Sequence, residues 1–174
     1  MHRVTAVFCL VALAATMSAG RVQAEDQFQV LTGKTFSQAL PAHYYLEGQA
    51  IPTQKRNAAL VKTPSGARVL LGLLDTSGYG SDITEKYHGM LITETKLSVC
   101  GNDLEVGSYG FGMKVGANPD QPKTFNVFDQ AGKKVCDCEA TRDADLKKPR
   151  PLQVVPGKEG AARFYVGRDF VEVK

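Results

Sequence analysis

The stretch from Asn57 to Leu74, NAALVKTPSGARVLLGLL, contains the clearest fold signal in this chain. Two β-prone, largely apolar runs, residues 57–62 and 67–74, flank the segment TPSG at residues 63–66. Proline at the second and glycine at the fourth position of that segment suit a type I turn, so the pattern predicts a β-hairpin. Because the second arm is apolar on both faces, we expect it to lie in the middle of the fold.

Turn signals recur at short intervals between β-prone segments in the rest of the sequence, which is typical of a sandwich or a barrel. One short helix is predicted over residues 81–87, with Ser81 as its N-cap. The predicted fold class is all-β, a single-domain antiparallel sandwich or small barrel with one short helix. Further strands are predicted at residues 90–99, 104–115, 124–129, 133–140, 152–155 and 162–173.

The predicted strand 104–115 carries large apolar side chains on one face and almost nothing on the other. Ser108, Gly110 and Gly112 occupy the bare face. Glycines at this spacing in a strand indicate a bend, or the close approach of another backbone or of a ligand.

The first 24 residues have the features of a cleaved secretory signal peptide. His2 and Arg3 precede an apolar run at residues 4–15, and residues 22–24 (VQA) form a small-x-small cleavage site. We therefore expect one exported domain at residues 25–174, either periplasmic or secreted. A transmembrane helix needs about 20 apolar residues, more than this run contains, so no membrane span is expected.

The charge of the exported chain is close to neutral. Cleavage would remove two of the 21 Lys and Arg residues and none of the 18 Asp and Glu residues, leaving a formal charge near +1. Nucleic-acid-binding proteins gather basic charge on one face, so no nucleic-acid partner is expected.

Three cysteines would remain after cleavage: Cys100, Cys136 and Cys138. Residues two apart in a strand point to the same side, so Cys136 and Cys138 are expected to face inward together. We expect a structural disulfide between Cys100 and either Cys136 or Cys138. The unpaired thiol could instead cross-link two chains into a disulfide-linked oligomer, or belong to a redox-active C-x-C pair.

A thiolate metal site has less support than a disulfide. His43 or His88 could complete a set of zinc or Cu(I) ligands with the three cysteines. Zinc sites normally use C-x₂₋₄-C spacing, however, and an oxidising compartment favours disulfides. We therefore expect no metal and no cofactor.

Residues 75–78 (DTSG) follow the apolar strand VLLGLL and resemble the signature of aspartic proteases. Residues 164–169 (FYVGRD) resemble the apolar-apolar-Gly-Arg-Asp segment of retropepsin-like proteases. The resemblance implies a homodimeric hydrolase in which Asp75 of each copy supplies one catalytic carboxylate. Ser77 stands where the family has glycine, so a hydrolase that uses carboxylates such as Asp75 or Glu47 is kept as an alternative function.

Residues 44–57 (YYLEGQAIPTQKRN) combine aromatic, acidic, amide and basic groups in a loop-like stretch before the hairpin. Binding residues often lie on such loops of a rigid β scaffold. We interpret the chain as an exported, non-enzymatic binding or interaction module for an unknown small molecule or protein. A disulfide-linked structural or assembly protein is a further alternative. The candidate ligand-binding residues are Tyr44, Tyr45, Glu47, Gln54, Lys55 and Arg56.

Overall fold

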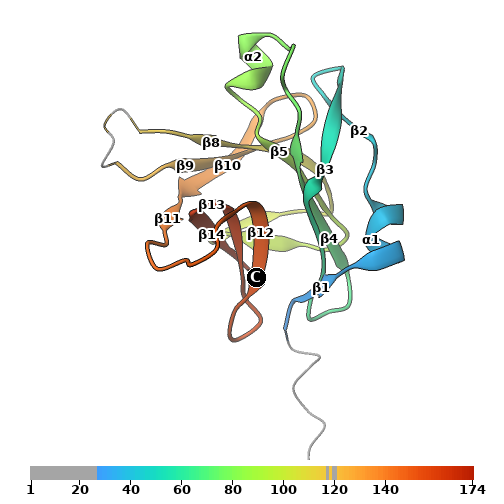
Figure 1. The fold of residues 1–174 in the computed structure, drawn as a ribbon, viewed down its shortest axis with the longest axis vertical. Coiled ribbons are helices and arrows are strands. Elements are labelled where there is room, and N and C mark those ends of the chain that lie inside the picture. Colours follow the sequence, from blue (N-terminus) through green and yellow to red (C-terminus); the bar gives the residue numbers. More distant parts are fainter. Residues whose placement is uncertain (1–26, 117, 119–120) are drawn as a thin grey trace, which may run out of the picture.

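The structure, a computed structural model, describes residues 27–116, 118 and 121–174. The predicted signal peptide lies outside these described residues. Two antiparallel β-sheets pack face to face around a shared hydrophobic core (Figure 1). The all-β, sandwich-like fold class predicted from the sequence is therefore confirmed.

The first sheet has eight strands and the second has six. The strands of the first are β1 (Gln29–Leu31), β2 (His43–Leu46), β3 (Gln49–Lys62), β4 (Arg68–Leu74), β5 (Gly89–Thr93), β8 (Gly107–Lys114), β9 (Thr124–Phe128) and β10 (Lys134–Glu139). Those of the second are β6 (Leu97–Val99), β7 (Asn102–Leu104), β11 (Thr141–Arg142), β12 (Arg150–Pro156), β13 (Ala162–Gly167) and β14 (Asp169–Val173). The first sheet has the order β1-β3-β4-β5-β8-β9-β10 with β2 beside β3, and the second has the order β12-β13-β14-β6-β7 with β11 beside β14.

The predicted hairpin forms the middle of the first sheet. β3 and β4 pair around the turn at residues 63–66, in which Gly66 donates its N–H to the Thr63 carbonyl at 2.9 Å. β4 lies between β3 and β5 and is buried on both faces, with Val69 in one core and Leu70 in the other. Burial on both faces explains why this arm is apolar on both faces from Val69 to Leu74, after the exposed Arg68.

Two hydrophobic cores lie on opposite faces of the first sheet. The inner core fills the space between the sheets, and the outer core lies against α1 (Gly33–Ala39), β2 and α2 (Ser81–Thr84). The inner core includes Val61, Val69, Leu71, Leu91, Phe111, Phe125, Leu97, Leu104, Phe164 and Val173. The outer core includes Leu40, Tyr44, Leu46, Ile51, Leu60, Leu70, Ile83, Tyr87 and Met90. The outer core holds α2 and the β2–β3 hairpin against the sheet.

Three predicted strands are divided in the structure, where the chain crosses between sheets or reverses direction. The predicted strand 90–99 becomes β5 and β6, which belong to different sheets, and 104–115 becomes β7 and β8. The predicted strand 162–173 becomes the hairpin of β13 and β14, with Gly167 at a φ of 66°. β-prone residues continue on both sides of each division, so the sequence pattern does not mark it.

The predicted helix is shorter than expected, and a second helix is present. The N-cap of α2 is Gly80 rather than Ser81, and the Gly80 carbonyl accepts the Ile83 N–H at 3.1 Å. Further helical bonds follow, and the last of them, from Tyr87 N–H to the Ile83 carbonyl at 2.9 Å, precedes the turn into β5. The sequence does not predict α1, because the N-terminal region shows no helical periodicity. Within the described residues, no helix combines the length and apolar character needed to cross a bilayer.

Candidate functional site

The segment 44–57, predicted to be a loop that binds a ligand, is instead β2, a tight turn and most of β3. Glu47 and Gly48 form the turn with φ values of 49° and 76°, the pair of positive φ angles typical of a type I′ hairpin. The expectation of a loop was wrong because the tyrosines are strand residues and only two residues make the turn; the ligand-binding role of these side chains stays a prediction. Tyr44 is consequently buried in the outer core, whereas Tyr45 is 61% exposed.

The remaining candidates in this segment also do not form a site together. The Gln54 amide donates to the Leu74 carbonyl at 3.0 Å and accepts from the Asn57 amide at 2.7 Å. These side-chain bonds link β3 to β4 where the regular backbone pairing of the two strands is interrupted. Lys55 and Arg56 are exposed where the register of β3 against β4 shifts. Gln54 therefore has a structural role, and Lys55 and Arg56 form no ion pair with any described residue.

Glu47 lies in a polar cluster with Lys86, Tyr87 and Gly132, which we call the Glu47 cluster. Its carboxylate accepts a hydrogen bond from Tyr87 Oη at 2.6 Å and forms an ion pair with Lys86 Nζ. Lys86 Nζ also donates to the Gly132 carbonyl at 2.7 Å. Gly132 has a φ of 87°, which favours glycine, and a Cβ atom there would lie 2.1 Å from Glu47 Oε1 and displace the carboxylate. The cluster ties the β2–β3 turn, the α2–β5 connection and the β9–β10 turn together.

The ionisation of the cluster follows from its contacts. Hydrogen bonds from Lys86 and then Tyr87 hold the pKa of Glu47 below its usual value. Burial, and then the neighbouring Glu47 carboxylate, raise the pKa of Tyr87, which stays protonated and donates. Burial raises the pKa of Tyr44 to about 12, against the smaller and opposite effect of Ser108 and Gln130 beside its hydroxyl. These phenols remain neutral at physiological pH.

The bare face of β8 is where the α2–β5 connection lies directly on the sheet. A Cβ atom at Gly110 would lie 2.7 Å from the Tyr87 ring, and one at Gly112 would lie 2.0 Å from the Lys86 carbonyl oxygen. The close approach of another backbone, one of the alternatives predicted from the glycine spacing, is therefore confirmed at Gly112, where that backbone is Lys86; at Gly110 the approaching group is the Tyr87 side chain.

A cleft of about 660 Å³ opens beside this contact, between α2 with its connection to β5 and the outer face of β8, β9 and β10. The two walls meet where Lys86 and His88 pass over Gly112. Phe128, half-buried, and Val115, 64% exposed, contribute apolar surface. The residues that line the cleft are Ser81, Asp82, Thr84, Glu85, Lys86, His88, Gly112, Met113, Lys114, Val115, Asn126, Phe128 and Lys134.

His88 presents a hydrogen-bond donor to the cleft. Its backbone N–H donates to the Phe111 carbonyl at 2.8 Å, and its Nδ1 accepts the Met113 N–H at 3.2 Å. Protein packed around part of the ring, and then the charge of Lys123, lower the pKa of His88. The imidazole is therefore neutral at pH 7, and because Nδ1 accepts, its proton lies on Nε2.

The charges of the cleft are divided between its walls. α2 and the residue after it contribute Asp82 and Glu85, and neither forms an ion pair with any described residue. The sheet wall contributes Lys114, which likewise has no ion pair among the described residues, and Lys134, which pairs with Asp137. The α2 wall thus carries two unpaired carboxylates beside Lys86, whose charge is paired with Glu47, and the sheet wall carries the unpaired Lys114 and the paired Lys134.

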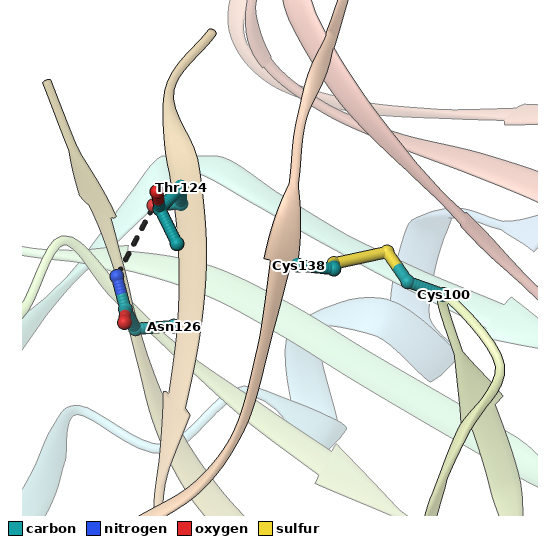
Figure 2. Close-up of a disulfide and its surroundings, with 4 residues drawn as sticks. All are labelled: Cys100, Thr124, Asn126 and Cys138. Carbon is teal, nitrogen blue, oxygen red and sulfur yellow. Dashed lines mark hydrogen bonds between the residues drawn. A yellow bond between two sulfur atoms is a disulfide. The ribbon is translucent and has the colours of Figure 1, made fainter. Parts of the chain in front are cut away.

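The structure pairs Cys100 with Cys138, one of the two partners that the sequence left open, at a Cα–Cα distance of 6.2 Å. Figure 2 shows the disulfide running from Cys100, in the turn after β6, to Cys138 in β10. It therefore joins the second sheet to the edge of the first. Cys136 keeps a free, half-buried thiol whose pKa is raised by burial and then by Asp137. No group of three or more His, Cys, Asp or Glu side chains within the described part of the chain is arranged to hold a metal ion.

The two segments that resemble retropepsin-like proteases have structural roles here. The Asp75 carboxylate accepts the Ser77 hydroxyl at 2.6 Å and the Ser77 N–H at 3.2 Å, and these bonds lower its pKa. It therefore caps its own turn at the protein surface. Asp169 is buried and bonded to Lys123 at 2.7 Å, with Arg142 at 3.5 Å.

Comparison with known proteins adds no functional assignment: no family model, curated protein or solved structure matches the chain. Function has to be argued from the cleft. The sequence analysis missed the cleft residues Lys114 and Lys134, since nothing in the pattern distinguishes them from other surface lysines. The signal that could have located the cleft is the glycine pair Gly110 and Gly112, which marks where another segment crosses the sheet.

Proposed function

We propose that this chain is an exported, non-enzymatic binding module and that the cleft between α2 and the outer face of β8–β10 is its ligand site. The observation that carries the proposal is the cleft itself. A volume of about 660 Å³ is in the range of pockets that hold small molecules, and its lining combines apolar surface with a few polar groups.

The wall formed by α2 and its connection is held in place by three sets of contacts. Lys86 is packed on Gly112, His88 is bonded to Phe111 and Met113, and the Glu47 cluster anchors the connection from the other side. A site that is formed before the ligand arrives loses less conformational entropy on binding. The geometry therefore favours recognition by a preformed pocket.

The hydrogen bonds of His88, which lines the cleft, and of Tyr87, in the neighbouring Glu47 cluster, favour binding over proton transfer at these two residues. A general base needs a free lone pair within reach of the substrate. His88 uses its Nδ1 lone pair for Met113 N–H and offers only the Nε2 proton to the cleft. Tyr87 has a raised pKa and donates to Glu47, so it is not available as a base at neutral pH.

The disulfide supports export. Stable disulfides are typical of oxidising compartments, and Cys100–Cys138 would be reduced in most cytosols. Together with the predicted signal peptide, it supports a mature chain that begins at Glu25, which the intact mass of the protein purified from the exported fraction would test.

The binding proposal is tested by mapping the surface with a small apolar probe. We expect phenol, titrated into ¹⁵N-labelled oxidised protein, to shift backbone amide signals of the cleft residues before those elsewhere. The variant Lys134→Trp places a bulky ring at the cleft and should abolish these shifts. Lys133→Trp is the matched control, because Lys133 is its exposed neighbour and does not line the cleft. Phenol shifts spread evenly over the surface would contradict the proposal.

A further inference from the structure

The placement of charge in the cleft points to the class of ligand. Asp82 and Glu85 lie on the wall formed by α2, and Lys114 and Lys134 lie on the wall formed by the sheet. A ligand with only a negative group would meet the carboxylates of the first wall, and a ligand with only a positive group would meet the lysines of the second. A ligand with both charges can satisfy both walls at once.

We infer that the cleft binds a short peptide with free termini, its ammonium group toward Asp82 and Glu85 and its carboxylate toward Lys114 and Lys134. This inference rests on the proposed function, because it assigns a ligand class to the same cleft. A free α-amino group has a pKa of about 7.7–8.0 and a free α-carboxyl group one of about 3.3–3.7, so a short peptide is a zwitterion at neutral pH.

The other features of the cleft suit a peptide as well. The apolar surface of Phe128 and Val115 offers contact to an apolar side chain of the ligand. His88 offers one N–H donor and Asn126 a side-chain amide, which match the carbonyl and N–H groups of a peptide bond. The Asn126 amide N–H also donates to the Thr124 carbonyl at 3.2 Å, which fixes its orientation.

The direct test uses one dipeptide in four charge states. Phenylalanyl-leucine is the zwitterion, its N-acetyl derivative the anion, its C-terminal amide the cation, and the doubly blocked form is neutral. We expect the zwitterion to bind most tightly and the neutral form most weakly, as measured by titration calorimetry and amide shifts. Ion pairs at exposed positions contribute modestly, so blocking one terminus should weaken binding by about two- to fivefold.

Variants assign each terminus to a wall. Lys114→Met should weaken the zwitterion and the anion but leave the cation unchanged. Glu85→Gln should weaken the zwitterion and the cation but leave the anion unchanged. Lys158→Met, at an exposed lysine away from the cleft lining, is the control and should change none of them.

The outcomes separate this inference from the function on which it rests. If all four forms shift the cleft signals with equal affinity, the cleft is a binding site but the zwitterion inference is overturned. The same conclusion follows if the anion or the cation binds more tightly than the zwitterion. If no form shifts the cleft signals and phenol does not either, the proposed binding function fails as well.

Discussion

Removal of the Cys100–Cys138 disulfide should cost a large part of the stability of this protein. The bonded cysteines are 38 residues apart in the sequence. In the chain-entropy model a loop of that length loses about 13 cal/mol/K in the unfolded state, or about 4 kcal/mol at 25 °C. Domains of this size are stable by about 5–15 kcal/mol, so the loss is a substantial fraction.

The perturbation is the double variant Cys100→Ser and Cys138→Ser, and the matched control is Cys136→Ser. Urea unfolding with linear extrapolation gives the free energy of unfolding of each. We expect the double variant to lose about 4 kcal/mol. The control should lose far less, because Cys136 is half-buried and unbonded. Equal losses in the two variants, or a loss below about 1 kcal/mol in the double variant, would refute the assigned pairing and its structural role.

Three further predictions concern the residues around the cleft. Gly112→Ala places a Cβ atom 2.0 Å from the Lys86 carbonyl oxygen and should destabilise the fold by about 1–3 kcal/mol in urea unfolding, whereas Gly107→Ala, 3.4 Å from its nearest neighbour, should be nearly neutral. The pKa of Glu47 in the folded state is below its ordinary 4.5, so the wild type should lose stability as the pH falls below 4.5. Glu47→Gln should make that decline shallower. An unchanged slope of stability against pH would exclude the ion pair with Lys86. His88 has a folded-state pKa below its ordinary 6.5, so the unfolded chain binds more protons as the pH falls through 6.5 and stability declines there. His88→Gln should flatten that part of the pH–stability curve, and a curve that keeps its slope would show that another group titrates.

The local pattern was sufficient to predict the central hairpin and the fold class. The apolar arm 67–74 and the TPSG turn correspond to β4 and its turn because both are determined by neighbouring residues. The close approach to Gly110 and Gly112 could also be predicted, since a strand face without side chains has to be covered by something else.

The candidate site could not be predicted, because it depends on contacts between distant segments. Glu47 meets Lys86 and Gly132 only because the β2–β3 hairpin folds over the outer core. The segment 44–57 was misinterpreted as a loop because its mixed polar composition hides the strand pairing of Tyr44 with Ile51. The chain also passes from the first sheet to the second between β5 and β6, and the sequence pattern of the predicted strand 90–99 does not indicate this crossing.

The proposed ligand site in the cleft between α2 and β8–β10 can be tested by intermolecular nuclear Overhauser effects. The oxidised protein would be studied with phenylalanyl-leucine in excess. We expect contacts from the peptide side chains to the Phe128 ring and the Val115 methyl groups. Contacts to the exposed ring of Tyr45 instead, with none at Phe128, would contradict the proposed site.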